Sequence, residues 1–143
     1  MADSGASSTT TIGCTAAAIG VEALIDKLPE LKEIANVKGE QIFQIASENM
    51  NNDHWLKLGK RVDFLLKQEE IDGIVITHGT DTMEETAYFL NLVIKSRKPV
   101  ILVGAMRPDT SISADGPLNL YNAVRLASTR VTHGSNLGKP RVI

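Results

Sequence analysis

The sequence predicts an α/β fold in which a parallel β-sheet is flanked by helices. Three observations lead to this class. Stretches with apolar residues at helical spacing alternate along the chain with short β-branched runs. The runs at 73–77 and 99–104 lack polar alternation, which is typical of parallel strands buried on both faces. A length of 143 residues, with 43% hydrophobic and 22% charged residues, suits one globular domain.

The first half of the chain is predicted to begin with a flexible loop. Residues 1–18 are rich in Ala, Ser, Thr and Gly, which is typical of a loop. The segment 21–35 has a helical stripe of Leu and Ile, but Pro29 in its middle predicts a break or two short helices. Residues 41–46 form a candidate strand. Asp53 is the predicted N-cap of a helix whose apolar stripe continues to Leu66.

The second half continues the alternation. A strand at 73–77 precedes a helix from Thr82 to about Ser96, where Thr82 and Glu85 have the spacing of a capping box. Another strand at 99–104 precedes a final helix from Leu118 to Ala127. This order indicates right-handed crossovers within one domain, 1–143. Residues 128–143 form an atypical tail, in which 139–143 has the character of a strand start.

Composition argues against several classes of function. A net charge of −2, with Lys and Arg spread along the chain, argues against nucleic-acid and membrane partners. No apolar run approaches the ~18 residues that a membrane helix needs. The start of the chain lacks the pattern of a signal peptide, so we expect a mature or trimmed form if the native protein is exported. The single Cys14 cannot form an internal disulfide, which leaves the redox compartment open.

Motifs for metals and nucleotides are also missing from the sequence. The three His residues and Cys14 have no zinc-site spacing, so we expect no metal. Neither glycine-rich phosphate motif occurs, so we expect no nucleotide cofactor. In open α/β sheets, ligands bind beyond the carboxyl ends of the strands. The loops at 47–49, 78–81 and 105–108 are therefore where a functional site is expected.

The loop at 78–81 is the most informative of the three. Gly79 allows a ligand to approach the backbone closely. Thr80 and Asp81 stand at a helix start, where unpaired amides and the helix dipole favour an anion. The Thr80 hydroxyl could orient or activate a water or a nucleophile, and the Asp81 carboxylate could hold an ammonium group. Both residues are also preferred helix caps, and capping alone accounts for them equally well.

The other two loops offer complementary groups. The Ser47 hydroxyl and neighbouring amides could bind a carboxylate, and Glu48 could accept from an ammonium group. The alternative interpretation of this pair is a polar exit from a strand. Ala105 follows the third strand, and its carbonyl could accept an amide N–H.

The segment 73–83 resembles the second signature of the asparaginase/glutaminase family. The segments 46–50, 84–90, 103–108 and 113–120 resemble bacterial type II L-asparaginases in the same order. The resemblance runs from about Ser4 to Ala127. It implies that the chain is part of the larger N-terminal α/β domain of the asparaginase fold, with 1–18 as a flexible active-site loop.

This resemblance implies roles for individual residues. Thr80 matches the second catalytic threonine, and Asp81 matches the acid that binds the substrate α-amino group. The Ala105 carbonyl would contact the side-chain amide, and Glu48 would tune tolerance for glutamine. The implied substrate-binding set is Ala46, Ser47, Glu48, Gly79 and Ala105. The implied reaction is hydrolysis of L-asparagine to L-aspartate and ammonia through a threonine acyl-enzyme, with glutaminase side activity and without metal or cofactor. The family's active unit is a homotetramer, and its exported members are periplasmic.

Several features of the family have no counterpart in the sequence. The Thr-Gly-Gly-Thr-Ile-Ala-Gly loop with the first threonine, the catalytic lysine and the C-terminal domain are not found, and Cys14 aligns with a tyrosine. An alternative is therefore a catalytically incompetent fragment that binds acidic amino acids or assembles with partner chains. A third hypothesis is the amidase subunit of a tRNA-dependent amidotransferase, and the continuous matches at 83–87 and 105–108 favour the asparaginases over it.

Overall fold

The computed structural model describes residues 20–129 and 141–142 of the chain. Its helices are α1 (Val21–Asp26), α2 (Leu31–Ile34), the 3-10 turn η1 (Ser47–Asn49), α3 (Asn52–Leu66), α4 (Met83–Val93) and α5 (Gly116–Ser128). Its strands are β1 (Asn36–Val37), β2 (Ile74–Thr77), β3 (Val100–Val103) and β4 (Arg141–Val142). Strands β2 and β3 form one parallel pair and β1 and β4 another. The predicted α/β fold with parallel strands flanked by helices is confirmed.

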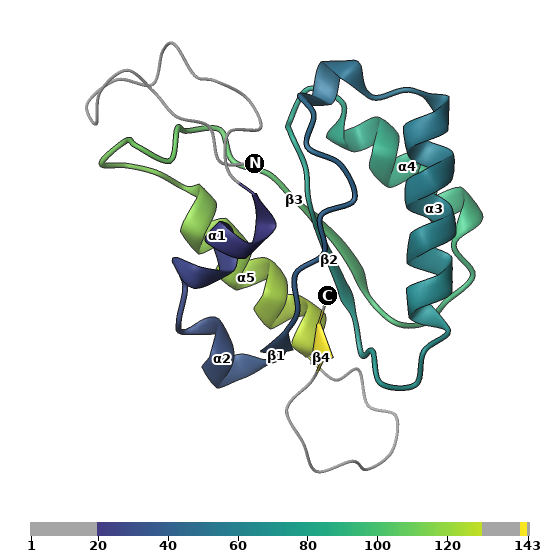
Figure 1. The fold of residues 1–143 in the computed structure, drawn as a ribbon, viewed down its shortest axis with the longest axis horizontal. Helices are drawn as coiled ribbons and strands as arrows, with labels where there is room; N and C mark the ends of the chain where they lie inside the picture. The colour runs from purple at the N-terminus through teal and green to yellow at the C-terminus, as the bar shows by residue number, and fades with distance from the viewer. Residues whose placement is uncertain (1–19, 130–140, 143) are drawn as a thin grey trace.

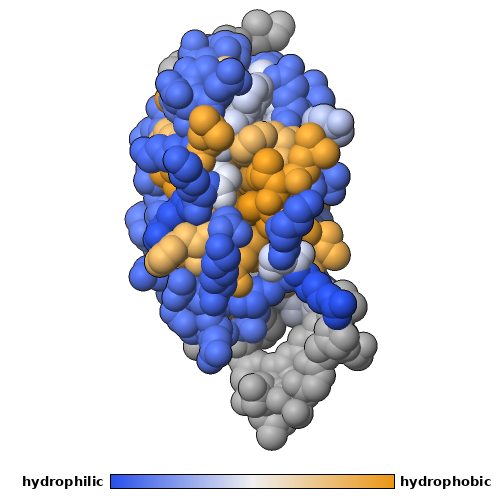
Figure 2. Space-filling view, turned by 90° about the vertical axis from the view of Figure 1, so that its right-hand side faces the viewer, coloured by the Kyte–Doolittle hydropathy of each residue, from blue (hydrophilic) through white to orange (hydrophobic). Residues whose placement is uncertain are grey.

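The described elements form three layers around the β2–β3 pair. Helices α1, α2 and α5 lie on one side of the strands, and α3 and α4 lie on the other (Figure 1). Figure 2, which looks onto the α3–α4 side, shows hydrophobic surface between hydrophilic borders. Large apolar side chains of these two helices are indeed exposed, among them Leu56, Phe64, Leu92 and Val93. A contiguous apolar surface of this kind is typical of an interaction site.

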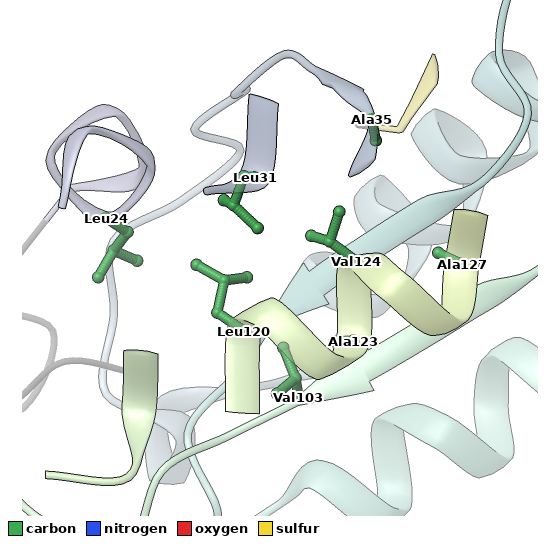
Figure 3. Close-up of a cluster of buried hydrophobic side chains, with 8 residues drawn as sticks. All are labelled: Leu24, Leu31, Ala35, Val103, Leu120, Ala123, Val124 and Ala127. Atoms are coloured by element: carbon green, nitrogen blue, oxygen red, sulfur yellow. The ribbon is translucent and has the colours of Figure 1, made fainter. Parts of the chain in front are cut away.

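Each face of the β2–β3 pair has its own apolar core. Along both strands, alternate residues face opposite sides, so Val75 and Ile101 pack on the α5 side and Ile74 and Val100 on the α3 side. Figure 3 shows the first core, in which leucines of α1, α2 and α5 point toward one another. The second core lies beneath α3 and α4 and comprises Leu58, Val62, Leu65, Leu66, Ile71, Ile74 and Leu90. Apolar packing on both faces explains why these strands have no polar alternation.

The predicted helices are present, with corrected ends. Pro29 does separate two short helices, as expected. The predicted cap of α3 was wrong: the side chain of Asn51, rather than Asp53, accepts a hydrogen bond from the backbone N–H of His54 at 3.1 Å. The final helix begins two residues earlier than predicted, at Gly116, because Pro117 fits a first helical turn.

The predicted capping box of α4 was also wrong. Thr82 is the N-cap residue, but its side chain makes no capping hydrogen bond. Instead, the Thr82 hydroxyl donates to the backbone carbonyl of Ser47 at 2.9 Å. A tertiary contact therefore takes the place of the local one. The helix ends at Val93, before the predicted Ser96.

The predicted strand at 41–46 was wrong as well. In the structure this segment is neither helix nor strand, because no described strand lies hydrogen-bonded beside it. The two-residue strands β1 and β4 were missed, since two residues carry no periodic signal; β4 lies within the predicted tail. The predicted loop at 1–18, Cys14 and most of the tail lie outside the described residues.

Candidate active site

Two loops meet at the carboxyl end of β2. Ser47 begins η1, and Asp81 follows β2 just before α4. The Ser47 hydroxyl donates to Asp81 Oδ2 at 3.1 Å, and the Asp81 backbone N–H lies 3.3 Å from Ser47 Oγ, to which it donates. Ser47 is only 5% exposed, whereas Asp81 is an exposed residue. The arrangement places a solvent-accessible carboxylate on a buried hydroxyl group.

Gly79 makes this close approach possible. A Cβ atom at Gly79 would lie 2.5 Å from Ser47 Oγ and 2.8 Å from Ser47 Cβ, distances that real side chains do not adopt. On its other side, the carbonyl of Ser47 receives the hydroxyl of Thr82. Ser47 is therefore held from both the β2 loop and the start of α4. The structure brings the predicted residues Ser47, Gly79 and Asp81 together.

A chain of hydrogen bonds, buried at its centre, joins this loop to α4 and α3. The Nδ1 atom of His78 lies 2.6 Å from the carbonyl of Gly79, and its Nε2 atom lies 2.9 Å from Thr86 Oγ1. Trp55 Nε1 donates to the same Thr86 oxygen at 2.9 Å. Because a carbonyl only accepts, Nδ1 carries the proton, and the Thr86 hydroxyl donates to Nε2. The Gly79 carbonyl is thus anchored to both α4 and α3.

Sequence reasoning missed Thr86 and Trp55 as parts of the site. Thr86 is fully buried on the inner face of α4, and Trp55 is the only tryptophan of the chain. A polar residue one turn after Thr82, on the face that carries apolar residues, was the one available signal for Thr86. Nothing in the sequence connects it to Trp55, which lies 31 residues away.

The loop after β3 is fixed by its own hydrogen bonds. The Asp115 carboxylate accepts from the backbone N–H groups of Met106 and Arg107 at 3.1 and 3.0 Å, and Asn119 Nδ2 donates to the Gly104 carbonyl at 3.0 Å. Burial raises the pKa of the Asp115 carboxyl, but these amide donors outweigh burial and hold the pKa below its ordinary value. Ala105 lies inside this anchored loop.

The remaining predicted residues lie at the end of β3 and in the turn η1. A Cβ at Gly104 would lie 3.0 Å from Thr80 Cγ2, so Thr80 borders the end of β3, next to Ala105. The carbonyl of Ala46 accepts from Asn49 N–H at 3.0 Å and closes η1. Glu48 is exposed in the same turn. Among the described residues, no hydrogen bond joins Glu48 to Asp81.

Neither a metal-binding cluster nor a membrane-spanning helix occurs among the described residues. Within residues 20–129 and 141–142, no three His, Cys, Asp or Glu residues lie where they could hold a metal ion together. None of the helices described there is long and apolar enough to span a bilayer.

Fold and site together define a class of protein: an α/β domain with parallel strands and a small cluster of polar groups at their carboxyl ends, where α/β sheets commonly bind ligands. The family model of the asparaginase N-terminal domain matches residues 3–137. The chain belongs to the asparaginase family. The match also extends ten residues beyond Ala127, where the resemblance was expected to end.

Curated relatives agree with this assignment. The chain is 58% identical over 128 residues to "L-asparaginase 2" of Bacillus subtilis, covering 90% of the chain and 34% of the relative. It is 56% identical over 137 residues to "Glutaminase-asparaginase" of Pseudomonas fluorescens, covering 96% of the chain and 38% of the relative. The chain therefore spans little more than a third of the length of these relatives.

A solved structure supports the same fold. The "Probable Cytoplasmic L-asparaginase" of Campylobacter jejuni matches with a TM-score of 0.84 and 57% identity, covering 88% of this chain and 38% of that one. A relative from Haemophilus influenzae, 59% identical over 116 residues, is instead named "Probable L-asparaginase periplasmic". The names of the relatives thus differ on the cellular compartment.

Proposed function

We propose that this chain supplies the substrate-binding half of an amidohydrolase that converts L-asparagine to L-aspartate and ammonia. The observation that carries the proposal is the contact between Ser47 and Asp81, 3.1 Å apart at the carboxyl end of β2. A free amino acid carries an ammonium and a carboxylate group on one carbon. A carboxylate beside a hydroxyl and backbone amides suits these two groups, and the names of the relatives support asparagine as the substrate.

In this proposal the Asp81 carboxylate binds the α-ammonium group of the substrate, and the Ser47 hydroxyl binds its α-carboxylate. Ser47 now donates to Asp81, so the ligand carboxylate has to take over this donor. The ligand ammonium then replaces the hydrogen bond that Asp81 loses. Binding at each end of the ligand therefore favours binding at the other, and Ala46 and Gly79 contribute the backbone around it.

The proposed chemistry is acyl transfer at the side-chain amide. A threonine hydroxyl attacks the amide carbon, the C–N bond breaks, and ammonia leaves with a proton. Water then hydrolyses the threonine ester and releases L-aspartate. Thr80, beside the end of β3, would orient or activate the attacking group, and the Ala105 carbonyl would accept the amide N–H of the substrate. No step requires a metal or a cofactor.

Since the chain spans 34% of the Bacillus relative, a second candidate function remains. In it, the chain is a catalytically incompetent fragment that binds acidic amino acids or assembles with partner chains. The same polar site would then bind L-aspartate without turnover. The two candidates differ in ammonia release and share the binding groups.

One set of variants tests both candidates. Ammonia release from L-asparagine and calorimetric binding of L-aspartate are measured for the 143-residue chain, Thr80→Ala and Asp81→Asn. Asp53→Asn, at an exposed carboxylate of α3, is the matched control. Turnover that Thr80→Ala abolishes supports the hydrolase. Binding without turnover, weakened by Asp81→Asn and not by Asp53→Asn, supports the fragment, whereas binding unaffected by Asp81→Asn refutes the proposed site.

Three finer proposals accompany the reaction. Glutaminase side activity depends on Glu48, and Glu48→Gln should change the ratio of rates on glutamine and asparagine. The whole protein is a homo-oligomer, a tetramer as in the family, and the apolar surface of α3 and α4 supports association; sedimentation velocity measures its state. The whole protein is exported, which fractionation of cells expressing it would test.

A further inference from the structure

Asp115 precedes the last helix, but its side chain does not cap that helix. It is the N-cap residue of α5, where an Asp side chain commonly accepts a hydrogen bond from a backbone N–H of the first turn. Here the side chain makes no such bond. Its two oxygens accept instead from the consecutive backbone N–H groups of Met106 and Arg107, at 3.1 and 3.0 Å. The carboxylate therefore holds the loop after β3 and not the start of its own helix.

Asn119, in the first turn of α5, holds the same loop at a second point. Its side-chain amide donates to the Gly104 carbonyl at 3.0 Å and to Asp115 Oδ2 at 3.3 Å. Ala105 thus lies between two residues whose backbone groups are both bonded to side chains at the start of α5. Asp115 and Asn119 together are called the α5 clamp below.

The α5 clamp determines where the Ala105 carbonyl points. A peptide unit is planar and trans, so its C=O and N–H groups point in opposite directions. The Met106 N–H points at Asp115, and the Ala105 carbonyl of the same peptide unit therefore points away from that carboxylate. Ala105 is only partly buried, and within residues 20–129 and 141–142 no hydrogen bond reaches its carbonyl. This acceptor is fixed in direction and is not used by the fold.

The clamped loop lies against the loop that follows β2. A Cβ atom at Gly104 would lie 3.0 Å from Thr80 Cγ2 and 3.1 Å from the His78 carbonyl, so the residue before Ala105 borders that loop. The Asp81 carboxylate, in contact with Ser47, belongs to the same loop. An amino acid bound by its α-groups at Ser47 and Asp81 therefore has the clamped loop among the neighbours of its side chain.

We infer that Asp115 is a positioning residue that makes this site prefer a side-chain amide to a side-chain carboxylate, an inference that rests on the proposed function. An amide N–H donates to a fixed carbonyl oxygen, whereas an ionised carboxylate only accepts and is repelled by it. Without the clamp, the peptide unit 105–106 is free to rotate and to present the Met106 N–H, a donor that suits a carboxylate. The clamp therefore favours L-asparagine and disfavours the product L-aspartate.

Amide hydrogen exchange tests the clamp itself. In the 143-residue chain, the Met106 and Arg107 amides should exchange at least about tenfold faster in Asp115→Ala than in the parent. Asp115→Asn keeps one acceptor oxygen and should show a smaller change. Asp109→Ala is the matched control, because this carboxylate belongs to the same loop but pairs with Lys27. Equal exchange in the parent and in Asp115→Ala would overturn the inference.

Ligand selectivity tests the role of the clamp. Calorimetry measures the affinities for L-asparagine and L-aspartate, with Thr80→Ala in every chain so that hydrolysis does not consume L-asparagine. Asp115→Ala should lower the preference for L-asparagine over L-aspartate at least about tenfold, whereas Asp109→Ala should leave this preference unchanged. Asp115→Asn, the milder change, should shift it in the same direction by less, and it keeps the test available if Asp115→Ala does not fold. A purely structural role would weaken both ligands equally, so an unchanged preference would overturn the inference.

Failure of the proposed function gives a different result. If the Thr80→Ala chain binds neither amino acid while exchange at Met106 and Arg107 still depends on Asp115, the substrate site is refuted, and the selectivity with it. If both amino acids bind and their ratio does not respond to Asp115, only the positioning role is refuted.

Discussion

Replacing Gly79 by alanine should destabilise the protein through a single steric contact. The new Cβ would lie 2.5 Å from Ser47 Oγ and 2.8 Å from Ser47 Cβ, so Ser47 has to move. Its backbone is held by η1, in which Met50 N–H donates to the Ser47 carbonyl at 3.0 Å, and by the Thr82 hydroxyl. Overpacking of this kind costs about 1–3 kcal/mol. Loss of the Ser47–Asp81 hydrogen bond adds about 1 kcal/mol, so we expect roughly 2–4 kcal/mol in all.

Urea denaturation of the 143-residue chain measures this loss. Gly116→Ala is the matched control, because its Cβ would meet Ala105 Cβ at an ordinary 3.5 Å and should change stability by no more than about 0.5 kcal/mol. Ser47→Gly removes both atoms that the new methyl group meets, so Gly79→Ala should cost less in that background. An equal cost of Gly79→Ala in both backgrounds would refute the steric argument.

Three further predictions concern the core, the hydrogen-bond chain and pH. Leu31 is 1% exposed, so Leu31→Ala leaves a cavity and should lower the free energy of unfolding by about 2–5 kcal/mol. Leu118 is 64% exposed, and Leu118→Ala should change the same free energy by less than about 0.5 kcal/mol in the same urea titration. Thr86→Val removes the hydrogen-bond partner of His78 Nε2 and of Trp55 Nε1, so it should cost about 1–3 kcal/mol and shift the fluorescence of Trp55. Thr86→Ser should restore both, and an unchanged spectrum in Thr86→Val would count against the hydrogen bond. The pKa of Asp115 is lowered in the folded state, so its stabilising contribution is complete above the ordinary value of 3.8 and is lost as pH falls through the lower folded-state pKa. Unfolding midpoints of Asp115→Asn should therefore vary less with pH in the acid range than those of the parent chain, and parallel curves would contradict this.

The elements that sequence reasoning predicted well are those with a local cause. The β-branched runs that became β2 and β3 pack against apolar residues on both faces. Pro29 separates α1 from α2 because a proline inside a helix interrupts its hydrogen bonds. The segment 41–46 had a similar local signal and still did not form a strand. A strand forms only beside another strand whose backbone groups pair with its own. The sequence of 41–46 does not indicate which strand that would be, so the local pattern alone could not predict the outcome.

The site was predictable to a similar extent. Ligands bind beyond the carboxyl ends of parallel strands, and this rule predicted a site at Ser47, Gly79 and Asp81. The structure places these three residues in contact. Their roles remain predictions. The supporting bonds of Thr86 and Trp55 could not be predicted, because they depend on how α3 packs against α4. The predicted capping box was wrong for a related reason. The Thr82 hydroxyl donates to the backbone carbonyl of Ser47, which lies in a loop distant in sequence.

The short pair of β1 and β4 joins segments that lie near opposite ends of the described chain. Asn36 is opposite Arg141 and Val37 opposite Val142, and η1, α3, β2, α4, β3 and α5 all lie between these two strands in the sequence. Contacts of such high sequence separation form late in folding, since closing a long loop costs conformational entropy before the contact is gained. With only two residues on each side, this pair should be the last part of the fold to close and the first to fray on heating.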